Sequence, residues 1–458
     1  MATTMATVTT ATGITATTTD TSASEVCEPP RAASRGGFRL PQLQPLPRCA
    51  RPIRSMHRTL ALLALLTLVP TMADAAEPRL VFGSPSGVAE IPFELFGNHI
   101  YVRGQVGDSD SLWVVLDTGA SSASISASKA KALGLKIESG GMAHGAGGVV
   151  EAGMVRGVDV RLPGLSLVGE RLSSLPLDEI EVQTGRPMDV IVGYSLLSRA
   201  VVEIDYAARV LHVSDPGKFT PRKSDVSLPL TFRQNLPYVK ASVELSGHSP
   251  IEGEFVLDAG AATALTIADD VVQREKLLEV VPHTLKSRAG GVGGAVENRV
   301  GRVDLLRLGP FAVERPITVF RLPSAGSISA SGTLGNIGGE VLRRFDVTFD
   351  YPHARLLLAA GPALTSEPFE TDMSGLVTRV SGDSTRALLV LWTQDDSPAR
   401  EAGIAAGDVI EAVDGRTPAA VTTATIREWF RRPGASYRLT IRRGSERRDV
   451  TLTTRRLI

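Results

Sequence analysis

The sequence predicts a mainly β chain in which two similar β-rich lobes face each other across a cleft and a small α+β domain follows. Three observations predict this fold class. The region between about residues 88 and 360 carries one pattern twice. In both copies, short runs of Val, Ile, Leu and Phe alternate with Gly, Pro and Asp, which is typical of strands joined by turns. After Ala360 the pattern changes, and helix signals appear between further strand-like runs.

The first residues have the composition of segments that precede a folded domain. Thr, Ala, Pro and Arg dominate residues 1–55, which we interpret as a disordered or mis-called N-terminal extension. Residues 56–75 combine a basic start, a short apolar core and a small-residue cleavage site, the pattern of a secretory signal peptide. We expect translation to start at Met56 and the mature chain to begin near Ala76. The apolar core is too short for a transmembrane helix, so we expect no integral membrane span in the mature chain; an uncleaved anchor is the alternative.

Charge and cysteine content argue against several classes of function. Lys and Arg number 49, as do Asp and Glu, so the zero net charge gives no support for a nucleic-acid partner. Both cysteines, Cys27 and Cys49, precede Ala76, so the expected mature chain has no disulfide and no thiolate nucleophile. The histidines are scattered without metal-ligand spacing, and we expect no metal and no cofactor.

Two acid-containing segments stand at corresponding places in the two copies. Residues 114–120 read Val-Val-Leu-Asp-Thr-Gly-Ala, and residues 255–261 read Phe-Val-Leu-Asp-Ala-Gly-Ala, an offset of 141. Each is an apolar, strand-like run that ends in Asp before a turn containing Gly. Asp117 and Asp258 are therefore candidates for the two halves of one site.

Matches on both sides of these acids extend the repeat to whole lobes. Residues 91–103 match 228–240 at an offset of 137, and residues 192–206 match 337–351 at an offset of 145. Matches in the same order with small changes of offset are what loop insertions produce.

We therefore predict lobe 1 over residues 76–215 and lobe 2 over residues 216–361. Each lobe has a helical candidate after its acid, at 126–133 and at 267–278, and then a Gly-rich loop. These loops lack the spacing of phosphate-binding loops and are predicted to be hairpin tips. Their glycines are Gly145, Gly147 and Gly148 in lobe 1 and Gly290, Gly291 and Gly293 in lobe 2.

The Asp-x-Gly-Ala segments, the Gly-rich loops and the apolar-apolar-Gly segments before a short helix together resemble the aspartic peptidase superfamily. The chain looks most like bacterial retropepsin-like peptidases, and the resemblance covers about residues 88–360. It implies a pseudo-twofold enzyme with Asp117 and Asp258 as catalytic residues and a polypeptide as substrate. It also implies that the Gly-rich loops are flaps; plain surface loops are the alternative. With the signal peptide, it places the protein most naturally in the periplasm.

The chemistry requires two carboxyl groups that face each other. At contact distance they cannot both ionise, so they share one proton and their pKa values are driven apart. The ionised carboxylate takes a proton from water, which attacks the peptide carbonyl, while the protonated partner stabilises the oxyanion. The pair titrates as a unit, and the reaction needs no metal or cofactor.

The loops around the two acids differ in one important residue. Gly119 and Gly260 permit the tight turns that aim the carboxyl groups inward. In the family, the residue after Asp is usually Thr or Ser, and its hydroxyl bonds to the opposite loop; Thr118 fits this role. Ala259 cannot make the bond, at a cost of about 0.5–1.5 kcal/mol. This departure puts the rigidity of the second loop, and the activity, in question.

The last part of the chain, residues 366–456, resembles the PDZ domain of bacterial envelope proteases. Its hallmark is residues 397–408, where Ser-Pro-Ala-x-x-Ala-Gly-hydrophobic is followed by Gly-Asp. Ser before Pro also predicts the start of a helix, which Gly403 would end.

A PDZ domain binds an extended chain end by adding it as a strand to a sheet edge. The resemblance implies that the strand at 376–380 and the helix at 421–432 line the groove. Backbone amides of the loop Ser374, Gly375 and Leu376 would receive the terminal carboxylate. A structural PDZ domain without a ligand is the alternative.

These observations lead to two functional hypotheses of different classes. The first is a secreted aspartic endopeptidase whose PDZ domain binds chain ends of substrates or partners. The second is a catalytically inactive peptide-binding or scaffold protein of the cell envelope, which Ala259 favours.

Overall fold

The computed structural model describes residues 6–8, 15–18, 77–145, 147–323, 332–381 and 386–458. Most of the predicted extension, the predicted signal peptide and both cysteines lie outside these ranges. Within the extension, Ala6–Val8 (β1) and Thr15–Thr18 (β2) are strands, and β2 pairs with β8 (Glu138–Gly145) of lobe 1. None of the helices in the described ranges is both long and apolar enough to cross a membrane.

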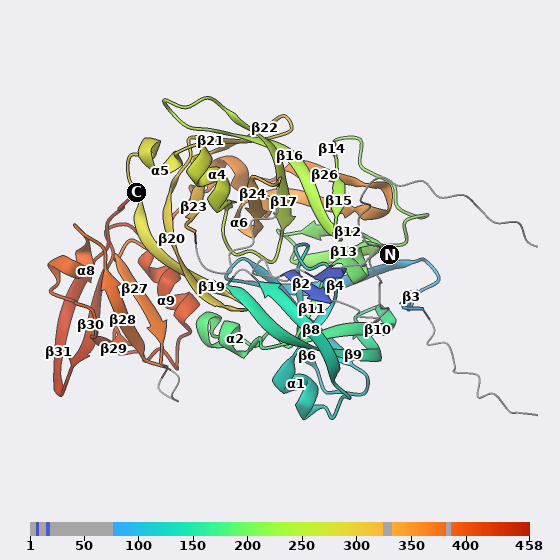
Figure 1. The fold of residues 1–458 in the computed structure, drawn as a ribbon, viewed down its shortest axis with the longest axis horizontal. Helices are drawn as coiled ribbons and strands as arrows, with labels where there is room; N and C mark the ends of the chain where they lie inside the picture. Colours follow the sequence, from blue (N-terminus) through green and yellow to red (C-terminus); the bar gives the residue numbers. More distant parts are fainter. Residues whose placement is uncertain (1–5, 9–14, 19–76, 146, 324–331, 382–385) are drawn as a thin grey trace, which may run out of the picture. The chain divides into compact units, whose positions relative to one another are not determined.

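Lobe 1 consists mainly of strands (Figure 1). Its helices are short, and α1 lies within the residues for which the sequence predicts a helix. Its elements are β3 (Arg79–Phe82), β4 (Val88–Phe96), β5 (His99–Val106), β6 (Leu112–Leu116), β7 (Ser124–Ser126), α1 (Ala127–Ala132), β8 (Glu138–Gly145), β9 (Gly148–Leu162), β10 (Leu165–Leu175), α2 (Asp178–Thr184), β11 (Val190–Val192), α3 (Tyr194–Leu197), β12 (Val201–Asp205) and β13 (Val210–Ser214).

Lobe 2 repeats this order of elements. The helix expected at 267–278 is two shorter helices, since Lys276 adopts a left-handed conformation with a φ of 49°. The elements are β14 (Val226–Pro229), β15 (Thr231–Arg233), β16 (Leu236–Glu244), β17 (Ile251–Asp258), β18 (Leu265–Ile267), α4 (Asp269–Arg274), α5 (Leu277–Val280), β19 (Leu285–Gly291), β20 (Gly294–Arg302), β21 (Leu305–Leu308), β22 (Phe311–Glu314), β23 (Ile317–Arg321), β24 (Gly335–Gly338), α6 (Gly339–Leu342), β25 (Phe345–Asp350), a 3₁₀ turn (Tyr351–His353) and β26 (Arg355–Ala360).

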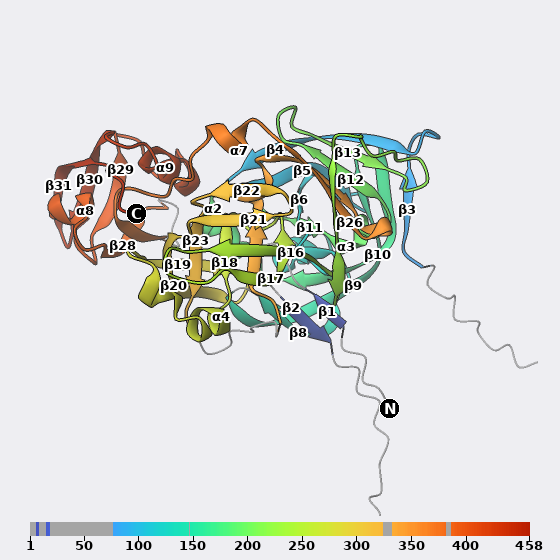
Figure 2. The ribbon, with the colours of Figure 1, turned by 90° about the horizontal axis from the view of Figure 1, so that it is seen from above.

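The two lobes are joined by an antiparallel pair of equivalent strands, β12 and β25. The pair lies within the strand order β4-β13-β12-β25-β26-β14, and Figure 2 shows β12, β13 and β26 side by side. Glu203 pairs with Thr348, which is its counterpart at the sequence offset of 145. Equivalent residues of the two lobes therefore pair with each other at the centre of the two strands. This register is the one expected if a pseudo-twofold axis passes between β12 and β25.

Each lobe sets its acid-bearing strand between two neighbours in the same way. In lobe 1, β6 pairs antiparallel with β5 and parallel with β11. In lobe 2, β17 pairs antiparallel with β16 and parallel with β24. Such central strands are buried on both faces, which accounts for the continuous apolar runs before the acids. Asp117 follows the end of β6 directly, and Asp258 is the last residue of β17.

The C-terminal domain has a five-stranded antiparallel sheet in the order β27-β28-β29-β30-β31. The strand predicted at 376–380 coincides with β27, and the helix predicted at 421–432 contains α9. The segment before the domain contains a short helix, α7 (Ala363–Ser366). The other elements are β27 (Leu376–Val380), β28 (Leu388–Thr393), α8 (Pro398–Glu401), β29 (Val409–Val413), α9 (Thr423–Phe430), β30 (Ser436–Arg443) and β31 (Glu446–Thr453).

The predicted fold class is therefore confirmed. The chain is mainly β, with two similar lobes and a small α+β domain.

Candidate active site

The carboxyl groups of Asp117 and Asp258 face each other in the interior. Their exposed fractions are 0% and 1%. A Cβ atom at Gly119 would lie 2.7 Å from Cγ of Asp258, so only glycine permits the two loops to approach this closely. The sequence prediction that the repeat brings these acids together is thus met by the geometry.

Each acid has its own set of hydrogen-bond donors. Gly119 donates its backbone N–H to Oδ1 of Asp117 over 2.9 Å. Oδ2 of Asp117 and Oδ1 of Asp258 have no donor among the described residues. A proton held between the carboxyl groups, or a water, can satisfy these two buried oxygens.

The pKa values of the pair are raised together. Burial raises the pKa of Asp117 well above its usual range, and the facing carboxyl group of Asp258 raises it further. Burial raises the pKa of Asp258 to about 6, while the proton that it shares with Asp117 and the hydrogen bond from Asn336 oppose that rise. Two buried acids in contact therefore hold one proton between them near neutral pH.

Asn336 makes the pair unequal, and the sequence reasoning missed it. Its Nδ2 donates to Oδ2 of Asp258 over 3.0 Å. The corresponding residue of lobe 1, at the offset of 145, is Ile191, which has no donor. The sequence did contain a signal for this role: Asn336 is polar, whereas the equivalent residue of the first copy, Ile191, is apolar.

The loop bond expected of Thr118 is present and one-sided. Its hydroxyl donates to the carbonyl oxygen of Leu257 over 2.8 Å and accepts the N–H of Ala259 over 2.8 Å. Thr118 is 1% exposed, so both bonds lie in the interior. The side chain of Ala259 is a methyl group and cannot make the equivalent bond to the first loop, as expected from the sequence.

A second exchange between the lobes involves two asparagines. Asn98 donates from Nδ2 to the carbonyl oxygen of Ala262 over 2.8 Å, and Asn235 donates to that of Ser121 over 3.2 Å. The two residues are repeat partners, and both adopt positive φ, 65° and 66°. Asn tolerates this conformation better than most residues. Each lobe thereby holds the acid-bearing loop of the other, a role that the sequence match at these positions did not reveal.

The Gly-rich segments form the tips of two hairpins, β8–β9 and β19–β20. The tips touch, and the N–H of Gly147 donates to the carbonyl oxygen of Val292 over 3.1 Å. A Cβ atom at Gly147 would lie 2.0 Å from the carbonyl oxygen of Gly294, so the contact requires glycine. Val292 is 1% exposed and packs in a cluster of buried residues that includes Ala120 of the first acid-bearing loop.

Comparisons with known proteins agree with this geometry. Residues 102–196, which include Asp117, match the family described as aspartyl protease, and residues 389–443 match the PDZ domain family. The predicted resemblance to aspartic peptidases with a C-terminal PDZ domain is confirmed.

The other comparisons add little detail. The search of curated proteins found no match. Among solved structures, an aspartic proteinase from Irpex lacteus aligns with 61% of this chain and 99% of its own, at 14% sequence identity and a TM-score of 0.38.

The loop of the PDZ domain that was predicted to bind a terminal carboxylate is engaged by the chain itself. The N–H of Ser374 donates to Oδ1 of Asp372 over 2.8 Å, and the N–H of Leu376 donates to the hydroxyl of Ser374 over 3.1 Å. Ser374 is 0% exposed, and a Cβ atom at Gly375 would lie 2.2 Å from Cβ of Ser397. Two amides of the predicted loop, those of Ser374 and Leu376, thus have partners within the chain, and the binding of a ligand carboxylate by this loop stays a prediction.

In the part of the chain that the structure describes, the His, Cys, Asp and Glu side chains form no group of three or more that could hold a metal ion.

Proposed function

We propose that the protein is an aspartic endopeptidase that hydrolyses polypeptides with a water activated by Asp117 and Asp258. The observation that carries the proposal is the buried pair of facing carboxyl groups, each held in a loop of one lobe with its inner oxygen lacking a donor. The match of residues 102–196 to aspartyl proteases supports a protease-type function.

The unequal hydrogen bonds favour one distribution of the shared proton. The donor Asn336 stabilises charge on Asp258, and Ile191 offers no such help to Asp117. In the starting state, Asp258 is ionised and Asp117 carries the proton. The two groups still titrate as one unit.

Hydrolysis then proceeds in two proton-balanced steps. Water bound between the carboxyl groups gives a proton to Asp258 as its oxygen bonds to the peptide carbonyl carbon, and Asp117 gives its proton to the carbonyl oxygen. The resulting diol returns one proton to Asp117 as the carbonyl re-forms. The C–N bond breaks as the amide nitrogen takes the proton held by Asp258, which leaves an acid, an amine and the original pair.

The hairpins are part of this proposal. Their touching tips act as flaps, which separate to admit an extended substrate and then exclude water from the closed cleft. The tips meet through the bond from the N–H of Gly147 to the carbonyl oxygen of Val292 and through glycines on both sides, and the proposal is that this contact opens when substrate enters.

We also propose that the protein is secreted, with the periplasm as its location, and that the PDZ domain binds polypeptide. The signal peptide pattern at 56–75 supports secretion. Mass spectrometry of the native N-terminus tests it. A mature chain that begins near Ala76 is expected, and a peptide from before Met56 contradicts the assigned start.

The experiment that tests the activity compares matched acid variants. The chain from residue 76 onward is incubated with unfolded casein at pH 4 to 8, and the products are sequenced by mass spectrometry. We expect Asp117→Asn and Asp258→Asn each to abolish cleavage. Asp108→Asn changes a side chain that is 97% exposed and serves as the control with full activity.

One observation favours a second function, that of an inactive peptide-binding protein. Ala259 leaves the second loop without its reciprocal bond. If wild type and Asp117→Asn give the same casein pattern while both bind casein, this second function replaces the first.

A further inference from the structure

The PDZ domain has a groove between an edge strand and a helix. β27 stands at the end of the sheet order and pairs only with β28 among the described strands, so its outer edge has no strand partner there; α2 of lobe 1 packs against β27 and α9 and forms a further wall of the groove. Ile426 and Phe430 of α9 are 1% and 3% exposed and pack with Leu376 in the core of this domain. Such an edge, with apolar side chains beside it, suits an extended peptide.

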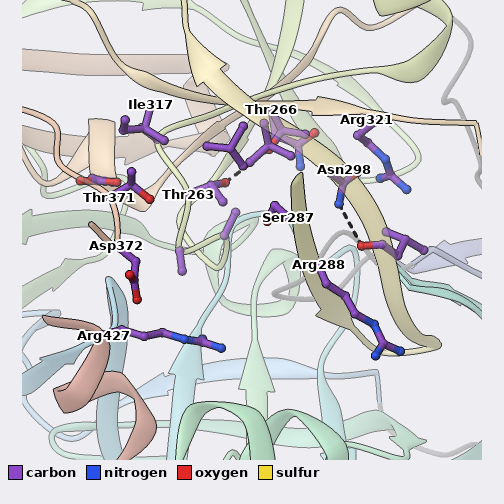
Figure 3. Close-up of a pocket in the computed structure, with 18 of the residues that line it drawn as sticks. Thr263, Thr266, Ser287, Arg288, Asn298, Ile317, Arg321, Thr371, Asp372 and Arg427 are labelled. Atoms are coloured by element: carbon purple, nitrogen blue, oxygen red, sulfur yellow. Dashed lines mark hydrogen bonds between the residues drawn. The ribbon is translucent and has the colours of Figure 1, made fainter. Parts of the chain in front are cut away.

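This groove and the catalytic site line one cavity of about 530 Å³. Asp258 and Asn336 line the cavity from the catalytic site, and Val377 and Thr378 line it from β27. Figure 3 shows Arg427 and Asp372 on one side and Ser287, Arg288 and Asn298 of the β19–β20 hairpin on the other. A polypeptide that leaves the catalytic site along lobe 2 therefore meets the PDZ groove without crossing open surface.

Specific contacts hold the PDZ domain against both lobes. Gln394 uses both atoms of its amide on the backbone of Lys286 in β19: it accepts the N–H over 3.1 Å and donates to the carbonyl oxygen. Val182 of α2 packs against the apolar core of the PDZ domain. Gly185 also lies close to Thr422, since a Cβ atom on the glycine would lie 2.8 Å from Cβ of Thr422.

The occupied loop limits what the groove can bind. Asp372 takes the N–H and the hydroxyl of Ser374, so a ligand carboxylate at this place would meet another carboxylate and lose those donors. An internal segment has no terminal charge and needs only the edge of β27 and the apolar side chains beside it.

We propose that the catalytic cleft and the groove between β27 and α9 form one continuous binding site, in which the PDZ domain binds an internal, extended segment of the polypeptide being cleaved. This inference rests on the proposed endopeptidase function and specifies its substrates: long, unfolded chains that fill cleft and groove together. Linking the two contacts in one chain makes the second binding event intramolecular and raises the overall affinity.

The test compares a short and a long substrate of the same sequence. A casein site that the wild type cleaves is made as a short peptide that fills the cleft, and as peptides extended toward either end. We expect at least one extension to raise kcat/KM roughly tenfold or more over the short peptide. Amidation of its C-terminus should leave that gain unchanged, because no terminal carboxylate is needed.

Two groove variants and one matched control complete the test. Val377→Asp and Thr378→Trp should reduce the ratio of kcat/KM between the long and the short peptide toward one. Arg379→Asp, on the same strand but exposed and outside the cavity lining, should retain the ratio. Circular dichroism melting curves confirm that each variant is folded. Equal kcat/KM for short and long peptides, or a gain that amidation removes, overturns the proposal.

A binding measurement separates this inference from the proposed activity. Fluorescence anisotropy follows fluorescein-labelled unfolded casein binding to the Asp117→Asn chain, where no cleavage occurs. If the double variant Asp117→Asn/Val377→Asp binds casein more weakly than Asp117→Asn alone, the groove takes part in binding, even if the wild type proves inactive. Unchanged binding rejects the groove even if the wild type is an active peptidase.

Discussion

Asn336 donates a hydrogen bond to Asp258, whereas Ile191 stands at the equivalent place beside Asp117. The repeat gives the two lobes the same strands, but this difference gives the two acids different electrostatic environments. A neutral donor within hydrogen-bonding distance favours the ionised form of its partner. The side-chain amide of Asn336 in β24 is thus the reason for assigning Asp258 as the base and Asp117 as the acid.

The first prediction replaces that amide with the residue of the other lobe. Asn336→Ile removes the donor, so the pKa of Asp258 should rise from about 6 by roughly one unit, the equivalent of one hydrogen bond. The active pair carries one proton, so activity rises with pH as Asp258 ionises. The acid limb of the kcat/KM profile should therefore move to higher pH. Ile191→Val is the control, and an acid limb that stays in place in Asn336→Ile rejects the assignment.

The second prediction concerns the one-sided loop bond. Thr118→Ala leaves the carbonyl of Leu257 and the N–H of Ala259 unpaired in the interior. The free energy of unfolding should fall by roughly 2 kcal/mol, and kcat should fall with it as the second loop loosens. Thr118→Ser keeps the hydroxyl and should recover most of both. Urea unfolding measures the effect, and equal losses in the two variants would point to packing of the methyl group instead.

The repeat explains how much of this site could be read from the sequence. The order of Asp117 and Asp258, each after an apolar run, was enough to predict two lobes and a facing pair. Asn98 and Asn235 were visible as matching residues, yet their bonds depend on how the lobes meet, which a local pattern does not contain. The same holds for Asp372: only the folded loop shows that its carboxylate takes the place expected for a ligand.

The third prediction links the buried acid to stability. The pKa of Asp258 is about 6 in the folded chain and 3.8 in its ordinary state, so between these values the folded state binds more protons than the unfolded state. The stability that this group contributes is present at low pH and is lost as pH rises through about 6, at up to about 1.4 kcal/mol per pH unit.

Asp258→Asn removes this titration. The difference in unfolding free energy, variant minus wild type, should therefore increase from pH 4 to pH 6. Urea unfolding at several pH values measures this difference, and Asp108→Asn supplies the control slope. A difference that stays constant across the window contradicts a raised pKa at Asp258.

The fourth prediction concerns the clamp between the PDZ domain and the second hairpin. Gln394 is 8% exposed as a residue, and its side chain bonds both backbone groups of Lys286. Gln394→Glu keeps an acceptor for the N–H but sets a carboxylate oxygen against the carbonyl of Lys286. We expect this repulsion to release β19 from the PDZ domain. Lys286→Ala alters only the side chain, leaves the backbone bonds available and is the matched control.

Hydrogen exchange followed by mass spectrometry measures this release. In Gln394→Glu, the amides of residues 285–291 should exchange faster, since opening of the hairpin no longer has to break the clamp. The gain in kcat/KM for extended peptides should shrink as well, because the groove and the cleft lose their fixed alignment. Faster exchange in Lys286→Ala as well would assign the effect to the hairpin itself. Unchanged exchange in Gln394→Glu would mean that other contacts, such as that of Val182 with the PDZ core, hold the domain.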